Sequence, residues 1–227
     1  MKYPLLLLLA VLLIAGCKKN TPSPGCSNLV RTVTSHGSIP GGDTIPITTT
    51  YTYDAQNRII QQAGPSVSYI YTYTANTVSK MFYQSGVLNS TNTGYLNAQG
   101  LLFSWEPGDT IYYDSLGEKV LEISPGDTAV FTWQNGDLIT QANHSPQGLY
   151  VDTFIYSTQL DMRNLGQPYM GKTPLHVQTA EHIYNNGLMP IWGATNYTFD
   201  GCGRVEIQYD INLNIARDTT TVKYTYY

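Results

Sequence analysis

Aromatic residues and threonines alternate along most of the chain, and this alternation predicts β-strands. In residues 51–53 and 71–73, both Tyr-Thr-Tyr, two rings fall on one face of an extended chain and a hydroxyl falls on the other. Such alternation is typical of a strand with one buried face. We therefore expect the tyrosines to face a core and the threonines to face water.

Each aromatic run ends in a recurring turn. Residues 51–60, 112–120 and 197–205 place Asp after the aromatics, followed by two variable residues, Gly or Asn, and then polar and apolar residues. Asp caps a turn through its own side chain, and Gly or Asn supplies the positive φ of a tight reversal. A second turn sequence, Pro-Gly-Asp-Thr, recurs at residues 107–110 and 125–128 and is typical of type II turns.

The two turn families predict an all-β fold, an antiparallel up-and-down meander of about 14 strands built from repeated hairpins. We expect a large curved sheet, either flattened or closed into a partial barrel. The clear strand patterns run for four to six residues, which is shorter than the roughly 9–11 residues of a transmembrane strand, so no pore is expected. Residues 162–174 are the least regular stretch and the best candidate for a functional loop.

The N-terminus is expected to be an export signal. Residues 1–16 contain an apolar run from Leu5 to Ile14 that is too short to span a bilayer. The run ends in Leu-Ile-Ala-Gly before Cys17, which resembles the lipobox of bacterial lipoproteins. That resemblance implies lipidation of Cys17; the alternative is an ordinary cleaved signal with an incidental cysteine.

Three segments follow from this interpretation: a lipoprotein signal peptide at 1–16, a lipidated Cys and flexible tether at 17–27, and a single β-repeat domain at 28–227. Lipoproteins retained at an inner membrane often carry Asp after the lipidated Cys, and this chain has Lys18. The resemblance therefore implies an outer-membrane location. Since no acidic run follows Cys17, we favour the periplasmic face over the cell surface.

Two cysteines remain after Cys17. In an oxidising compartment Cys26 and Cys202 are expected to form a disulfide that closes most of the domain into one loop. Two free thiols are the alternative. A metal site is less favoured because no CxxC or histidine pair flanks either cysteine.

Composition excludes several classes of protein. Charged residues make up 12% of the 227-residue chain, its formal net charge is −4, and it contains 27 threonines and 19 tyrosines. These values exclude a coiled coil, a disordered acidic tail and a basic protein that binds nucleic acid. The hydrophobic fraction of 42% is sufficient for a core.

No catalytic or metal-binding group is apparent, and we expect neither a cofactor nor a metal. His176 and His182 would share a strand face without a third ligand, no motif supports a nucleophilic triad, and no pair of carboxylates is marked out for glycoside hydrolysis. The tryptophans are interpreted as sheet packing, with sugar stacking as the alternative; they are Trp105, Trp133 and Trp192. Five Asp-Thr/Ser sequences are either strand starts or O-glycosylation signals; they begin at Asp43, Asp109, Asp114, Asp127 and Asp218.

The Tyr-Asp-x-x-Gly-Arg rhythm of residues 28–227 resembles the YD repeats of Rhs-type proteins. It resembles more closely a group of secreted bacterial lipoproteins of unknown function that are described as porin-like in fold. The resemblance implies no active site. We expect a lipid-anchored envelope protein, most simply a non-enzymatic binding or scaffolding module for a protein or glycan partner. The alternatives are an envelope hydrolase or glycan-binding protein with a site built from loop residues, and part of a Rhs-like shell.

Overall fold

A computed structural model describes residues 25–39, 42–105, 108–185, 191–213 and 219–227. The predicted signal peptide and Cys17 lie outside these residues. The strands are β1 (Val30–Ile39), β2 (Gly42–Asp43), β3 (Ile47–Tyr53), β4 (Ile59–Ala63), β5 (Val67–Tyr73), β6 (Thr77–Gln84), β7 (Val87–Leu96), β8 (Leu102–Trp105), β9 (Thr110–Tyr113), β10 (Lys119–Ser124), β11 (Asp127–Gln134), β12 (Asp137–Ser145), β13 (Gly148–Leu160), β14 (His176–Asn185), β15 (Ile191–Phe199), β16 (Val205–Asn212) and β17 (Thr219–Tyr226). One 3₁₀ turn, η1, spans Pro168–Met170. No helix in the described part of the chain is long and apolar enough to cross a membrane.

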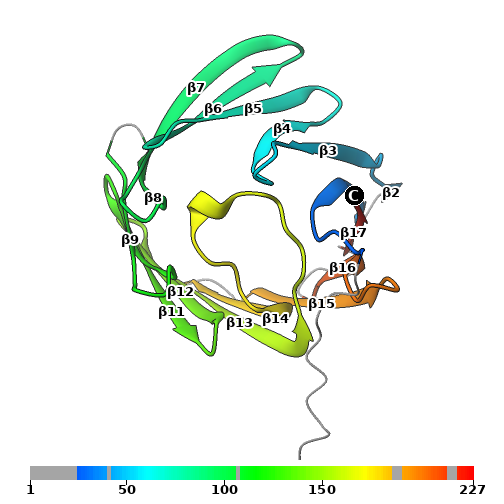
Figure 1. Cartoon of the computed structure of the whole chain (residues 1–227). Helices are drawn as coiled ribbons and strands as arrows, with labels where there is room; N and C mark the ends of the chain where they lie inside the picture. Colours follow the sequence, from blue (N-terminus) through cyan, green and yellow to red (C-terminus); the bar gives the residue numbers. More distant parts are fainter. Residues whose placement is uncertain (1–24, 40–41, 106–107, 186–190, 214–218) are drawn as a thin grey trace, which may run out of the picture.

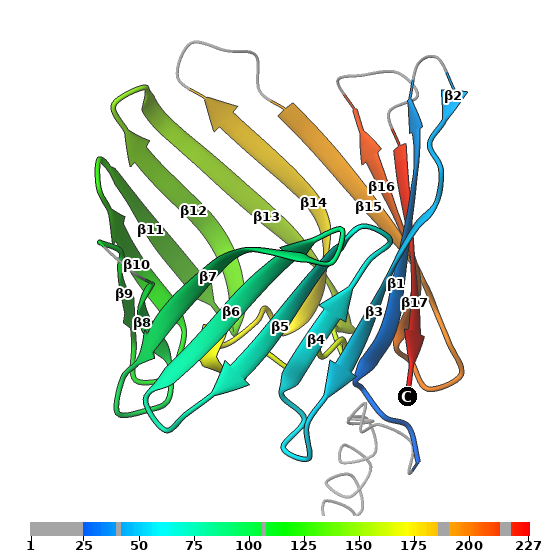
Figure 2. The same cartoon turned by 90° about the horizontal axis from the view of Figure 1, so that it is seen from above.

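The strands form a single antiparallel meander that curves into a nearly closed barrel (Figures 1 and 2). β1 pairs with both β3 and β17, which joins the two ends of the meander. β8 pairs with β7 and β9 pairs with β10, but no residue pairing joins β8 to β9 in the described chain. Among the described strands, this gap is the one seam of the wall. The predicted all-β meander and partly closed barrel are confirmed.

Two sequence expectations about the strands were wrong. The first concerns the number of strands: the described residues form 17 strands, where about 14 were expected. The second concerns their length: β13 runs for 13 residues, where four to six were expected. β7 shows why: it continues through residues 89–93, Asn-Ser-Thr-Asn-Thr, which have no apolar alternation. The backbone hydrogen bonds of a strand need no apolar side chain, so polar strands escape a search for hydrophobic periodicity.

The predicted sidedness is confirmed. On β3, Tyr51 is buried whereas Thr48, Thr50 and Thr52 are exposed. Outward threonines hydrogen-bond across strands, as between the hydroxyls of Thr34 and Thr48, which lie 2.8 Å apart. The inside of the wall is therefore aromatic near one end, and the outside presents hydroxyls to water.

The predicted turn geometry is also present. The Asp54 carboxylate accepts the backbone N–H groups of Gln56 and Arg58, each at 2.9 Å, and Asn57 has a φ of 61°. The carboxylate of Asp200 caps its own turn in the same way. Local side-chain hydrogen bonds therefore set the hairpin turns at this end of the barrel.

Six aromatic side chains each donate a hydrogen bond to a backbone carbonyl at a β-bulge on a neighbouring strand. Tyr73 Oη donates to Ile59 O at 2.7 Å, and the register between β3 and β4 shifts immediately after Ile59. The same arrangement joins five further donor–acceptor pairs: Tyr53–Val30, Trp133–Lys119, Tyr156–Leu138, Tyr197–Gln178 and Tyr226–Val205. A bulge leaves ladder groups unpaired, so the ring needs a polar end, which phenylalanine lacks.

Candidate functional site

The expected functional loop folds into the barrel. Residues 161–175 cross the lumen inside the ring of strands (Figure 1). Tyr169, on η1, is only 4% exposed and belongs to the same buried cluster as Tyr51, Tyr71 and Ile59. Figure 2 places this segment toward the barrel end that carries the C-terminus. We call residues 161–175 the plug, and the opposite end of the barrel the mouth.

Backbone hydrogen bonds join the plug to several hairpin turns around the wall. Gly166 O accepts the N–H of Ile59 at 2.8 Å, and Lys172 N–H donates to Gly117 O at 2.9 Å. Leu175 N–H donates to Gly136 O at 3.0 Å, and Asn164 O accepts the N–H of Val30 at 3.1 Å. The plug is therefore fastened to the turns of three hairpins and to the start of β1, across one end of the lumen.

Arg163 forms the floor of the remaining space. Its guanidinium lies in a bidentate ion pair with Asp161, at 2.5 Å for the closest contact. Nη1 also donates to Gln208 Oε1 at 2.6 Å and to Tyr224 Oη at 3.0 Å. Burial opposes the charge, but the hydrogen bonds and the charge of Asp161 outweigh it and raise the pKa of Arg163. Arg163 is therefore held in place, and the negative charge of Asp161, which also belongs to the plug, largely balances its positive charge.

A cavity of about 520 Å³ lies between Arg163 and strands β14–β17. Hydrogen bonds already order its polar groups, with Thr195 Oγ1 donating to Asp210 Oδ1 at 2.8 Å and Gln208 Nε2 donating to the same carboxylate at 2.9 Å. Its size is in the range of ordinary ligand sites. The polar side chains that line it include Arg163, Gln178, Glu181, Thr195, Gln208 and Asp210. We call this space the lumen cavity.

Carboxylates give the lumen cavity an acidic wall. Burial raises the pKa of Glu181, and the nearby charges of Asp152 and Asp210 add to the effect, against a hydrogen bond from Gln178 that lowers it. Burial also raises the pKa of Asp152. Desolvated carboxylates that lie near one another hold protons more tightly than exposed ones.

The sequence did not single out these lumen residues, but one signal was available. Thr195 and Tyr197 lie two positions apart on β15, and both line the cavity. The charged residues Glu181 and Asp210 lie within strands and also point inward. A charged residue that falls on the same strand face as the inward aromatic residues therefore indicates a polar lumen. The aromatic residues by themselves indicate only a buried face.

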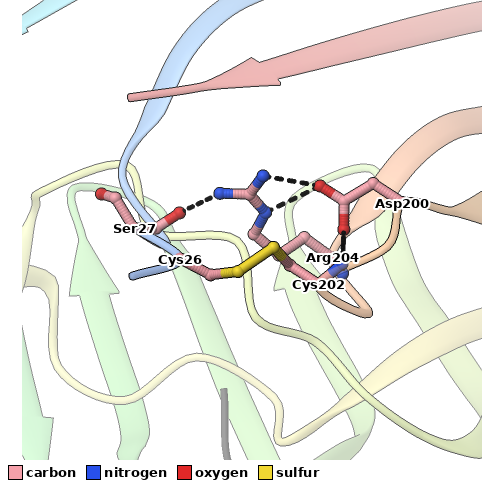
Figure 3. The surroundings of a disulfide bond; sticks show 5 residues. All are labelled: Cys26, Ser27, Asp200, Cys202 and Arg204. Atoms are coloured by element: carbon pink, nitrogen blue, oxygen red, sulfur yellow. Dashed lines mark hydrogen bonds and ion pairs between the residues drawn. A yellow bond between two sulfur atoms is a disulfide. The ribbon is translucent and has the colours of Figure 1, made fainter. Parts of the chain in front are cut away.

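The structure contains the disulfide between Cys26 and Cys202, with Cα atoms 6.2 Å apart (Figure 3). Cys202 lies in the turn that Asp200 caps. In that turn Arg204 forms an ion pair with Asp200 at 2.7 Å and donates a hydrogen bond to Ser27 O. The start of the domain is therefore fastened to a turn at the plugged end.

The two histidines on β14 do not act together. His176 Nδ1 lies 2.8 Å from Asp137 Oδ2, and its backbone N–H donates to Asp137 Oδ1 at 2.9 Å. His182 lies in register with Trp192 on β15, next to inward-facing Glu181. In the residues that the structure describes, no group of three or more His, Cys, Asp or Glu side chains is placed to hold a metal ion.

The other marked residues have structural surroundings. Trp133 Nε1 donates to Lys119 O, whereas Trp105 lines a second cavity. Among the Asp-Thr/Ser sequences, Thr44 Oγ1 donates to Gly37 O at 3.0 Å, and Ser115 is exposed in its turn. The side chain of Trp192 and residue Asp218 lie outside the described residues.

No protein-family model matches the chain, and no curated protein is significantly similar to it in sequence. A solved structure, a porin-like protein from Bacteroides uniformis, is similar with a TM-score of 0.62 and 14% identity over 90% of this chain and 98% of that chain. A second porin-like protein, from Bacteroides vulgatus, has a TM-score of 0.44 and 10% identity over 88% and 99% of the two chains. The first likeness shows the fold alone: this chain has the barrel of a porin-like protein.

Proposed function

We propose that this protein is a lipid-anchored outer-membrane protein, facing the periplasm, that binds a small polar molecule in its lumen without converting it. The observation that carries the proposal is the plug. It lies across one end of the barrel and borders the lumen cavity through Arg163, and the hydrogen-bonding side chains of that cavity are held in place. A polar, preformed cavity favours capture of a ligand.

Two features argue against a transmembrane pore. The seam between β8 and β9 has no residue pairing in the described chain, and unpaired strand edges are not tolerated in lipid. The outward face of β3 carries Thr48, Thr50 and Thr52 in place of an apolar band. We infer that the lipid on Cys17 alone holds the protein at the membrane. A porin-like barrel is compatible with an envelope location.

The disulfide supports an orientation for the barrel. Cys26 is fastened to the plugged end, and the sequence from Cys17 to Cys26 reaches at most about 30 Å when fully extended. The plugged end would then face the membrane and the mouth would face away from it. A ligand would enter the lumen from the aqueous side.

Occlusion of the cavity tests the proposal. Gly193 faces the lumen cavity, and a Cβ placed there meets only backbone oxygens at 3.9 and 4.0 Å, so Gly193→Trp fills the cavity with little strain. Asn196→Trp, on the exposed side of the same strand, is the matched control. The full chain is titrated with uncharged oligosaccharides, polyamines and amino acids.

The proposal predicts that at least one of these compounds binds and is recovered unchanged. It also predicts that Gly193→Trp abolishes binding and Asn196→Trp preserves it. Equal affinity in the two variants would contradict the proposal.

A hydrolase is the second candidate, and the carboxylates of the lumen cavity favour it. Glu181 has a raised pKa beside Asp152 and Asp210, which is the arrangement expected of a general acid with a carboxylate partner. If the protein is a hydrolase, the bound compound is recovered cleaved, and Glu181→Gln abolishes cleavage while binding persists. Recovery of the intact compound from the wild-type chain rejects this candidate.

A further inference from the structure

A second cavity, of about 420 Å³, lies in the lumen against strands β5–β8 and the plug, and its lining differs from that of the lumen cavity. Three aromatic side chains contribute to it, together with amide groups. The principal residues are Tyr71, Lys80, Asn92, Trp105, Gln167 and Tyr169. We call it the aromatic cavity.

Register fixes one wall of the aromatic cavity. Tyr71 pairs with Lys80 across β5 and β6, and Lys80 pairs with Asn92 across β6 and β7. Directly opposed residues project from the same face of a sheet, so the three side chains form one row across the wall. Lys80 Nζ lies 4.4 Å from the centre of the Tyr69 ring, which holds the ammonium against the wall.

A glycine positions the indole of Trp105. Trp105 on β8 pairs with Gly94 on β7, and a Cβ at Gly94 would lie 3.1 Å from both Cε3 and Cζ3 of the indole. It would also lie 2.4 Å from Leu102 Cδ1. The missing side chain at position 94 therefore lets the indole pack directly against the neighbouring strand, while part of the indole lines the aromatic cavity.

Charge distinguishes the two cavities. Lys80 and Asp109 are the charged residues that line the aromatic cavity, and their formal charges cancel. In the lumen cavity, Arg163 is paired with Asp161, which leaves the charges of Glu181 and Asp210. A neutral, aromatic site with amide groups suits a ligand that has apolar C–H faces and ring hydroxyls.

We propose that the aromatic cavity is a saccharide subsite that takes one uncharged sugar unit. The indole of Trp105 contacts the C–H face of the sugar, and the amides of Asn92 and Gln167 donate to and accept from its hydroxyls. Tyr71 and Tyr169, which are 3% and 4% exposed, support this site from below. This inference rests on the proposed function: one unit of a bound oligosaccharide occupies the aromatic cavity and its other units occupy the lumen cavity, so Gly193→Trp abolishes its binding as well.

Calorimetric titration of the full chain tests the subsite. The chain is purified from membranes in a detergent without a sugar headgroup, and the probes are maltotriose, cellotriose and triacetylchitotriose. At least one probe binds, and Trp105→Ala and Asn92→Leu each weaken its affinity about tenfold or more. Phe103→Ala is the matched control, since Phe103 lies on the same strand and is 40% exposed; it leaves the affinity unchanged.

Two results would overturn the subsite. One is that none of the three probes binds; the other is that a probe binds equally well to wild type, Trp105→Ala and Asn92→Leu. The second result, combined with loss of binding in Gly193→Trp, would leave the proposed function intact and place the ligand in the lumen cavity instead. Asn92→Leu keeps the test decisive if Trp105→Ala fails to fold.

Discussion

Gly166 of the plug lies against the ring of Tyr53 on β3, so closely that a Cβ on Gly166 would lie 2.6 Å from Cε1 of the ring and 2.7 Å from Asn57 O. The arrangement is repeated further along the plug. A Cβ on Gly171 would lie 2.6 Å from Tyr113 Cε1 and 2.8 Å from Gly117 O. Both glycines also have a positive φ, of 67° and 83°. In each case a glycine of the plug packs against the tyrosine ring and the turn backbone of one hairpin.

Gly166→Ala should dislodge the plug. The added methyl group meets the Tyr53 ring and a strained backbone together, so we expect a loss of about 2–4 kcal/mol in the free energy of unfolding. Gly100→Ala is the control, because Gly100 has a φ of 76° but nothing within 4 Å of its Cβ position. Hydrogen exchange of residues 161–175 should rise only in Gly166→Ala; equal exchange in both variants would argue that the plug does not depend on this contact.

Tyr73→Phe should destabilise the barrel by about 1–2 kcal/mol. The substitution leaves Ile59 O at the bulge without its 2.7 Å hydrogen bond, and the ring keeps its packing. Tyr112→Phe serves as the control because Tyr112 is 47% exposed. Chemical denaturation compares the two, and identical stabilities would show that the tyrosine hydroxyls contribute nothing at the bulges.

Loss of the disulfide should lower stability by about 5 kcal/mol in the chain-entropy view, because Cys26 and Cys202 are 176 residues apart. The double variant Cys26→Ser/Cys202→Ser should unfold at lower denaturant concentration than wild type. Reductant should bring wild type to the same midpoint and leave the variant unchanged. A wild-type midpoint that is insensitive to complete reduction would contradict this prediction.

Glu181→Gln should stabilise the protein at neutral pH. Burial, reinforced by Asp152, raises the pKa of Glu181 above its ordinary value of 4.5, so the folded state holds this proton more tightly than the unfolded state. The ionised group therefore costs stability above its folded pKa, and the cost disappears as the pH falls below the unfolded pKa.

The melting temperature of Glu181→Gln should exceed that of wild type by a few degrees at about pH 7.5 and match it at about pH 3.5. Glu122→Gln is the comparison, since Glu122 is in an ion pair with Lys119 at 3.0 Å and should not gain stability at neutral pH. A gain at pH 3.5 as large as that at pH 7.5 would show that charge is not the cause.

Cys17→Ala should move the protein from the membrane fraction to the soluble fraction. Acyl chains contribute about 0.8 kcal/mol of membrane-binding free energy per buried CH₂. In our proposal the barrel wall itself makes no contact with the membrane. The control variant Lys19→Ala should remain in the membrane fraction. Retention of Cys17→Ala by washed membranes would indicate that the barrel itself associates with lipid.

Local chemistry made much of the wall predictable. The alternation around Tyr51 sets which face is buried, and Asp54 caps its turn through contacts within four residues. The position of the plug was not predictable in this way, because Gly166 meets Tyr53 only after the hairpins have closed into a barrel. The bulge contacts of the tyrosines were hidden for the same reason, since they depend on register between strands.

The lumen cavity was harder still to predict. Arg163 and Gln208 lie far apart in sequence, and only the path of the plug brings them to 2.6 Å. Asp161 lies two residues before Arg163, so the sequence indicates a local ion pair between them. It does not indicate the cavity that Arg163 lines. The inward polar surface on β15 and β16 was therefore not predicted, and only the path of the plug turns that surface into a site.

The most direct test of a ligand-binding lumen compares two cysteines introduced singly at adjacent positions of β15. Thr195 lines the lumen cavity and Asn196 is exposed outside, while Cys26 and Cys202 are joined in a disulfide. Thr195→Cys and Asn196→Cys are each labelled with a small methanethiosulfonate reagent, with and without the compound that binds in the titration panel. We expect the compound to slow labelling at position 195 and not at position 196. Equal labelling rates at position 195 with and without the compound would show that the lumen does not hold it.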